Sequence, residues 1–247
     1  MRRLLFTALL CTSFFASSEE TISRWMSDYF KRIHDHIGNE NYEKAEYELE
    51  MGNNNYFRGG RTYEAALLYQ LYGQFYAVQS QYTEAVPWFE KALATDKMPR
   101  IGAQEVRFQL AQTYFMIGKY ENVISLLEEF IRVGERYKYP VSARANLLMS
   151  YSHGRLEQYE PSYYHIKQAN NKSDKPQIDW IEYAFSLAMK LENLDDAEDL
   201  GTRLLFLEPN KKKYWNQVSA LYFAKDFELN SLSALELAYE NDTLNKE

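Results

Sequence analysis

The chain has 247 residues, of which 46% are hydrophobic and 26% charged, the balance of a folded protein and not of a disordered one. With 28 basic and 35 acidic residues, its net charge of −7 argues against nucleic acid as the main partner, because phosphate binding needs a concentrated basic face. The one cysteine, Cys11, excludes an intrachain disulfide and a cysteine-based zinc cluster.

Residues 1–18 have the features of a secretory signal peptide. Arg2 and Arg3 form a cationic start, an apolar run covers residues 4–16, and small residues precede Glu19. A helix of thirteen residues rises about 20 Å, which is short of the roughly 30 Å hydrocarbon core of a bilayer. The sequence therefore predicts export, with no stable membrane insertion once the signal is removed.

The signal peptide is predicted to be cleaved after Ser18. A lipoprotein signal would need a small residue just before its cysteine, whereas Leu10 precedes Cys11 here. We therefore do not expect lipidation, and the mature chain would contain no cysteine, which suits an oxidising compartment.

A pattern of a large residue, a small residue three positions later and a large apolar residue four positions further on recurs six times. The clearest copy is Tyr82, Ala85 and Phe89; the fifth copy has Gly201 in the last place. The small-residue column holds Ala45, Ala85, Val123, Ser162, Ala197 and Ser231, in steps of 34 to 40 residues. Self-similarity at such a period is typical of a repeat architecture.

A second pattern lies about twelve residues before each small residue, and Trp215, Val218, Ser219 and Tyr222 form its best copy. Positions three and four apart share one face of a helix, so the two patterns together predict a pair of packed helices in each repeat. Small residues on the first helix, such as Gly73, would let the second helix approach closely. The wider steps of the first repeats imply longer turns or longer helices.

Together the two patterns resemble the tetratricopeptide repeat, W-x2-L-G-x2-Y followed by A-x3-F. The resemblance covers about residues 20–240. It implies an all-α fold, a right-handed α-solenoid of about six helix-turn-helix repeats that occupies residues 19–247. The repeats are expected to begin near residues 26, 66, 104, 143, 178 and 212. Stability in such a fold comes from stacking each repeat against its neighbours.

The sequence lacks the common motifs that carry catalysis or bind metals and phosphates. The sequence has no H-E-x-x-H, G-x-S-x-G or phosphate-binding glycine motif. His34 and His36 are two positions apart, so on a helix they point to different sides and would not share a metal. We therefore predict that the protein is not an enzyme and uses no cofactor and no metal.

The resemblance implies a binding groove lined by first-helix residues that do not pack between repeats. The predicted partner-binding residues are Gln70, Gln74, Phe108, Gln112, Phe115, Tyr151, Arg155 and Glu182, and the same face continues to Asn216 and Phe223. Amides suit the backbone of an extended peptide, and aromatic rings offer flat apolar contacts. The alternative is that some of these aromatic rings simply pack under a neighbouring helix. The expected partner is a protein or an extended peptide.

The run from Trp180 to Glu240 also resembles the exported repeat component of TonB systems in marine gammaproteobacteria, although Asn241, Asp242 and Thr243 depart from the small-residue turn of that family. This resemblance implies a periplasmic scaffold that serves a TonB-type energised outer-membrane transport system. The alternative is a general envelope adaptor for outer-membrane protein insertion or for division. Loss of the signal peptide would leave a net charge of −9 and favour a basic partner.

Overall fold

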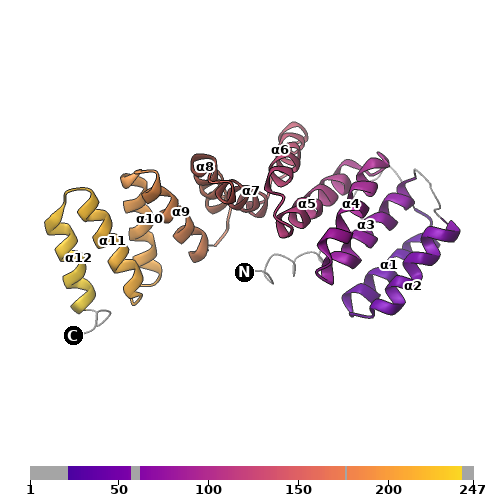
Figure 1. The fold of residues 1–247 in the computed structure, drawn as a ribbon, viewed down its shortest axis with the longest axis horizontal. Coiled ribbons are helices and arrows are strands. Elements are labelled where there is room, and N and C mark those ends of the chain that lie inside the picture. Colours follow the sequence, from indigo (N-terminus) through magenta and orange to yellow (C-terminus); the bar gives the residue numbers. More distant parts are fainter. Residues whose placement is uncertain (1–21, 57–61, 176, 241–247) are drawn as a thin grey trace. The chain divides into compact units, whose positions relative to one another are not determined.

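A computed structural model of the chain describes residues 22–56, 62–175 and 177–240 (Figure 1). Helices make up all the regular secondary structure of these ranges, which confirms the predicted all-α solenoid class. The predicted signal peptide, residues 1–18, and its expected cleavage site lie outside the described residues.

Twelve helices of the described ranges form six consecutive pairs. The first members are α1 (Arg24–Gly38), α3 (Tyr63–Val78), α5 (Arg100–Met116), α7 (Ala143–Arg155), α9 (Ile178–Lys190) and α11 (Lys212–Ala224). The second members are α2 (Tyr42–Met51), α4 (Tyr82–Ala94), α6 (Tyr120–Tyr137), α8 (Tyr159–Asn171), α10 (Leu194–Leu207) and α12 (Glu228–Glu240), and a π-helical turn, η1 (Gly52–Tyr56), continues α2.

The longer spacing of the second and third steps of the repeat column comes from longer helices, whereas the first step has a longer connection between its helices. Helices α3, α5 and α6 have 16, 17 and 18 residues, whereas α9 and α11 have 13 each. Since one turn takes 3.6 residues, these early helices are about one turn longer than the late ones. Both explanations that the sequence left open therefore apply, because eleven residues, 52–62, connect α2 to α3 whereas four, 208–211, connect α10 to α11.

The turn inside every pair has the same backbone conformation. Five positions before each small residue of the repeat column the chain adopts a positive φ, at Glu40, Ser80, Gly118, Glu157, Glu192 and Asp226. In each turn the amide of the following residue donates to a carbonyl five positions back, as Gln81 does to Tyr76 at 2.9 Å. This hydrogen bond closes the end of the first helix and fixes the reversal of the chain.

Side-chain caps mark where several of the pairs begin. The hydroxyls of Ser23, Thr62 and Ser142 accept hydrogen bonds from backbone amides in the first turns of α1, α3 and α7. Such caps satisfy amides that have no partner within the helix, so they stop the helix from extending backwards into the preceding linker.

The chain divides into two compact units, Met1–Pro140 and Val141–Glu247. In the N-terminal unit α3 packs against α1, α2 and α4, and α4 packs against α5. In the C-terminal unit α8 packs against α9, and α10 packs against α11. Each unit is therefore an array of helix pairs in which neighbouring pairs cover one another, as repeat stacking requires.

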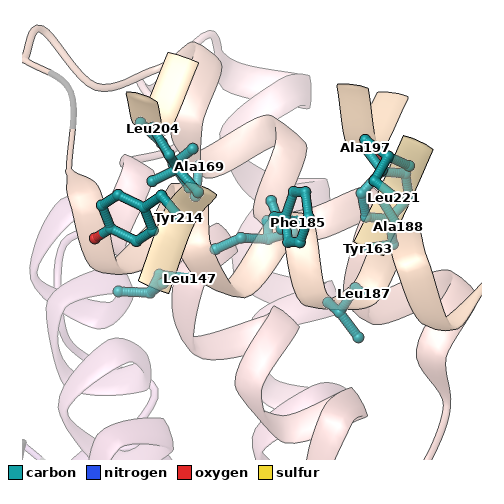
Figure 2. Packing of buried hydrophobic residues seen from close by; sticks show 13 residues of the cluster. Leu147, Tyr163, Ala169, Phe185, Leu187, Ala188, Ala197, Leu204, Tyr214 and Leu221 are labelled. Atoms are coloured by element: carbon teal, nitrogen blue, oxygen red, sulfur yellow. The ribbon is translucent and has the colours of Figure 1, made fainter. Parts of the chain in front are cut away.

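The core of the C-terminal unit runs through several pairs. Figure 2 shows Phe185 of α9 at its centre, with Tyr214 beside Leu204 and Ala169. Gly201 of α10 leaves room for this core, because a Cβ there would lie 3.1 Å from the Phe185 ring and 2.8 Å from Val218. Here the large residue is on the first helix and the small one on the second.

The N-terminal unit has the opposite arrangement at α3 and α4. A Cβ on Gly73 would lie only 2.6 Å from the ring of Phe89, so the glycine on the first helix makes space for the aromatic ring on the second. The large and the small side chain thus change places between the two pairs, and each glycine makes room for a ring, as close packing demands.

Candidate partner-binding surface

In the N-terminal unit, the predicted glutamines lie on α3 and α5. Gln70 and Gln74 are each 4% exposed and Gln112 is 6% exposed. The amide of Gln70 donates to the side-chain oxygen of Gln109 over 3.2 Å, so these two helices are joined by a buried amide pair. A buried hydrogen bond of this kind holds helices in register and costs free energy when broken.

Phe108 and Phe115 are half-buried on α5. Each packs on an aromatic side chain of α6: Phe108 lies 5.9 Å from the ring of Phe130, and Phe115 makes an edge contact with Tyr120 at 5.4 Å. Each ring therefore packs in part against α6 and leaves the rest of its surface accessible.

Glu105 is a further candidate residue of this face that the sequence analysis did not single out. It lies three positions before Phe108 and seven before Gln112, which places all three on one face of α5. Its side chain is half-buried, and burial raises the pKa of its carboxyl group. A carboxylate that loses water in this way favours a cation from a ligand. The three-residue spacing between Glu105 and Phe108 could have identified Glu105 from the sequence, because it places both residues on one helix face.

In the C-terminal unit, Tyr151 and Arg155 lie on α7. Tyr151 is half-buried, its ring makes an edge contact with Tyr183 at 5.1 Å, and burial raises the pKa of its hydroxyl to about 12. It is therefore a neutral hydrogen-bond donor and acceptor at physiological pH. Arg155, the last residue of α7, is exposed.

Glu182 on α9 is held by side chains of α11. It accepts hydrogen bonds from the Tyr214 hydroxyl at 2.6 Å and from Lys213 at 2.9 Å. Burial opposes the ionised form, but these two donors outweigh it and lower the pKa of the Glu182 carboxyl group. Glu182 thus joins neighbouring repeats, and Lys213 of the Lys211–Lys213 run is drawn into the same contact.

The first helices of the C-terminal unit also present open side chains. Ser186 and Lys190 on α9 are exposed, and so is Asn216 on α11. Phe223, at the last turn of α11, is 67% exposed. An exposed aromatic side chain, on helices that also expose polar groups, is a candidate for contact with a partner.

Solved structures with the same fold are tetratricopeptide-repeat proteins. MamA matches with a TM-score of 0.59 and 16% identity over 72% of this chain and 92% of its own. YrrB, described as a repeat protein with an unusual peptide-binding site, matches with a TM-score of 0.58 and 15% identity over 71% and 86%. A repeat protein from Parabacteroides merdae matches with a TM-score of 0.57 and 16% identity over 89% and 80%.

This chain has the tetratricopeptide-repeat fold. No family model matches the sequence, and no curated protein is significantly similar to it. Identities of 15–16% establish the fold alone.

Two further properties concern the described ranges only. None of their helices combines the length and apolar character needed to cross a bilayer. Among these residues no group of three or more histidine, cysteine and carboxylate side chains is placed to hold a metal ion. The partner-binding role of the eight predicted groove residues stays a prediction.

Proposed function

We propose that this tetratricopeptide-repeat protein is a non-catalytic periplasmic scaffold that binds a protein or an extended peptide. Its partner would belong to a TonB-type energised outer-membrane transport system. The observation that carries the binding role is the open face of α7, α9 and α11, where the exposed Phe223 stands on the same set of helices as Asn216, Ser186 and the half-buried Tyr151.

The chemistry of this face favours an extended peptide over a small molecule. Its polar groups are distributed over three successive helices of the C-terminal unit. A peptide that lies across several helices meets a polar side chain from each, whereas a small molecule needs groups that converge on one cavity. The peptide-binding site in the description of YrrB is a precedent for this use of the fold.

Charge supports a basic partner. The chain carries a net charge of −7, and Glu105 adds a half-buried carboxylate on the α5 face. Association between an acidic scaffold and a lysine-rich segment would be fast and would weaken as salt screens the charges. The Pro- and Lys-rich periplasmic segment of a TonB-type protein has this chemistry.

Binding of that segment to the purified mature chain tests the proposal. Fluorescence anisotropy with a labelled peptide should give a Kd that rises about tenfold between 50 and 300 mM salt. Phe223→Ala should weaken binding by about threefold or more, since it removes the most open aromatic contact of the face. Tyr47→Ala is the matched control, because Tyr47 is an aromatic residue of α2 that is 63% exposed.

Crosslinking of a tagged chain in intact cells tests the biological context. Recovery of a TonB-type protein or its inner-membrane motor partners would support the transport role. Recovery of outer-membrane assembly or division proteins would favour the general envelope adaptor, and normal growth of a deletion strain under iron limitation would contradict the transport role.

A further inference from the structure

The last helix of the described chain is apolar on two sides. Ser231, Ala234 and Ala238 of α12 are buried on the side that packs against α11. The other side carries Leu229, which is 79% exposed, and Leu232, which is 58% exposed. Large apolar side chains that are exposed close together on one element mark a surface that another element can cover.

The exposed side chains form one continuous stripe. Leu229, Leu232, Glu236 and Tyr239 follow one another in steps of three, four and three residues, which places them along one face of α12. All four are exposed, and Tyr239 retains 48% of its accessible surface. Leucine and tyrosine at these steps are the anchors by which one helix receives another.

The preceding pair shows how such a face is used. Helix α10 begins 34 residues before α12, so Asp195 and Glu198 occupy the places of Leu229 and Leu232. On α10 these two carboxylates form ion pairs with Lys225, the residue that directly follows α11, at 2.9 and 2.6 Å. Of the two, Glu198 is half-buried by this contact and also accepts a hydrogen bond from Tyr222 of α11 at 3.2 Å, whereas Asp195 stays exposed. Leu232 of α12 thus has the position at which a following helix makes contact, with a leucine where the internal contact has a charge.

We propose that this face of α12 is a docking surface for a net-basic amphipathic helix of a partner protein. The two leucines require an apolar residue from the incoming helix at the place that Lys225 has after α11, because a buried ammonium group there would have no carboxylate to pair with. The incoming helix would therefore differ from α11 at its contact positions while lying in a similar place.

The charge of α12 favours a different protein, and not a second copy of this chain, as the occupant of this face. Helix α12 contains three glutamates, Glu228, Glu236 and Glu240, and no lysine or arginine. Two copies that met through this face would bring their Glu236 carboxylates into one interface, because Glu236 lies within the stripe itself. Like charges placed together in this way oppose association, whereas lysine or arginine on a partner helix would pair with them.

A peptide made from α11 provides the probe. It comprises residues 211–226 with Tyr222→Leu and Lys225→Leu, and it carries a fluorescent label. We expect it to bind the full mature chain, and we expect Leu232→Glu to weaken that binding about tenfold, since a charge would be buried against apolar groups. The unmodified α11 sequence should bind several-fold more weakly, because its lysine meets two leucines. A peptide with Lys211–Lys213 changed to glutamate should also lose affinity.

Two controls keep the test specific. Tyr47→Glu introduces the same charge at an exposed aromatic residue of α2 and should leave binding unchanged. Leu229→Glu provides a second variant of the face, and far-UV circular dichroism verifies that each variant is folded. Failure of the modified peptide to bind, or binding that Leu232→Glu leaves intact, would overturn the proposal. So would sedimentation of the unmodified protein as a dimer that Leu232→Glu dissociates, because a second copy would then be the occupant.

Discussion

At the scale of single residues, the packing of each helix pair depends on where the chain places its smallest side chains. Gly73 lets the Phe89 ring approach the backbone of α3, and Gly201 leaves space for Phe185. Where neither member of a pair is so small, hydroxyl groups join the helices: Ser150 donates to the carbonyl of Ser162 at 2.7 Å, and Ser162 donates back to that of Ser150 at 2.8 Å.

Gly73→Ala tests the close approach of α3 and α4. The added methyl group would lie 2.6 Å from buried ring atoms of Phe89, so the ring or the helices must move. Overpacking of this kind costs about 1–3 kcal/mol, and we expect the free energy of unfolding in urea to fall by that amount.

Gly38→Ala is the matched control for this prediction. Gly38 ends α1, and a Cβ there would meet nothing within 4 Å. The same substitution should therefore be neutral or should stabilise the protein by up to about 1 kcal/mol, because alanine is the better helix former. Equal losses of stability in both variants would contradict the steric explanation.

The residue scale also shows how far sequence reasoning reaches. The repeat column could be predicted, and Ala45, Ala85, Val123 and Ala197 are all completely buried. The burial of Gln70 could not be predicted. Periodicity tells which face of a helix a residue occupies, but it does not tell how closely the neighbouring helix covers that face.

Prediction of the candidate site was limited in the same way. The pattern placed Phe108 and Phe115 on the first helix of their repeat but left open whether they pack or bind, and both have an aromatic partner on α6. Glu182 was predicted from its register, whereas its hydrogen bonds to Lys213 and Tyr214 depend on how α9 and α11 meet in space. Such contacts between repeats are set by tertiary packing.

At the scale of helices, the pair formed by α7 and α8 contains an arrangement that is sensitive to acid. His153 and His165 stack with their rings 5.6 Å apart, and His165 lies 3.3 Å from the side-chain oxygen of Asn146. Burial, followed by the neighbouring His153 and Lys172, lowers the pKa of His165 to about 4. The folded pair therefore contains His165 in its neutral form down to acidic pH.

This shift predicts a loss of stability between about pH 6.5 and pH 4. In that window the unfolded chain binds a proton at His165 that the folded chain does not, so acid favours unfolding. Because the side chain is partly exposed, we expect about 1–2 kcal/mol from this group. Urea unfolding at pH 7 and pH 4.5 measures it, and His165→Asn should lose less stability over that interval than the unmodified protein. Equal losses would exclude His165 as the cause.

At the scale of the whole molecule, the C-terminal unit has a hydrophobic core of its own. The C-terminal unit has a core that includes residues from Leu147 to Leu221, contributed by five successive helices. Further contacts between its repeats connect Tyr163 with Asp196 and Tyr214 with Glu182, at 2.6 Å each. In a repeat array the stability is close to a sum of each repeat and its contact with the next, so a run of repeats with its own core can fold as a unit.

A fragment of residues 141–247 is therefore expected to fold by itself. Its core residues all lie within the unit Val141–Glu247, so separation from residues 1–140 removes none of the contacts that form this core. Far-UV circular dichroism should show a helical protein, and urea should unfold it in one cooperative transition with a lower midpoint than the full chain. Phe185→Ala, which empties the centre of this core, should cost about 3–5 kcal/mol and unfold the fragment more readily than the full chain. A fragment with little helix would mean that the repeats of residues 1–140 contribute contacts without which the second core does not form.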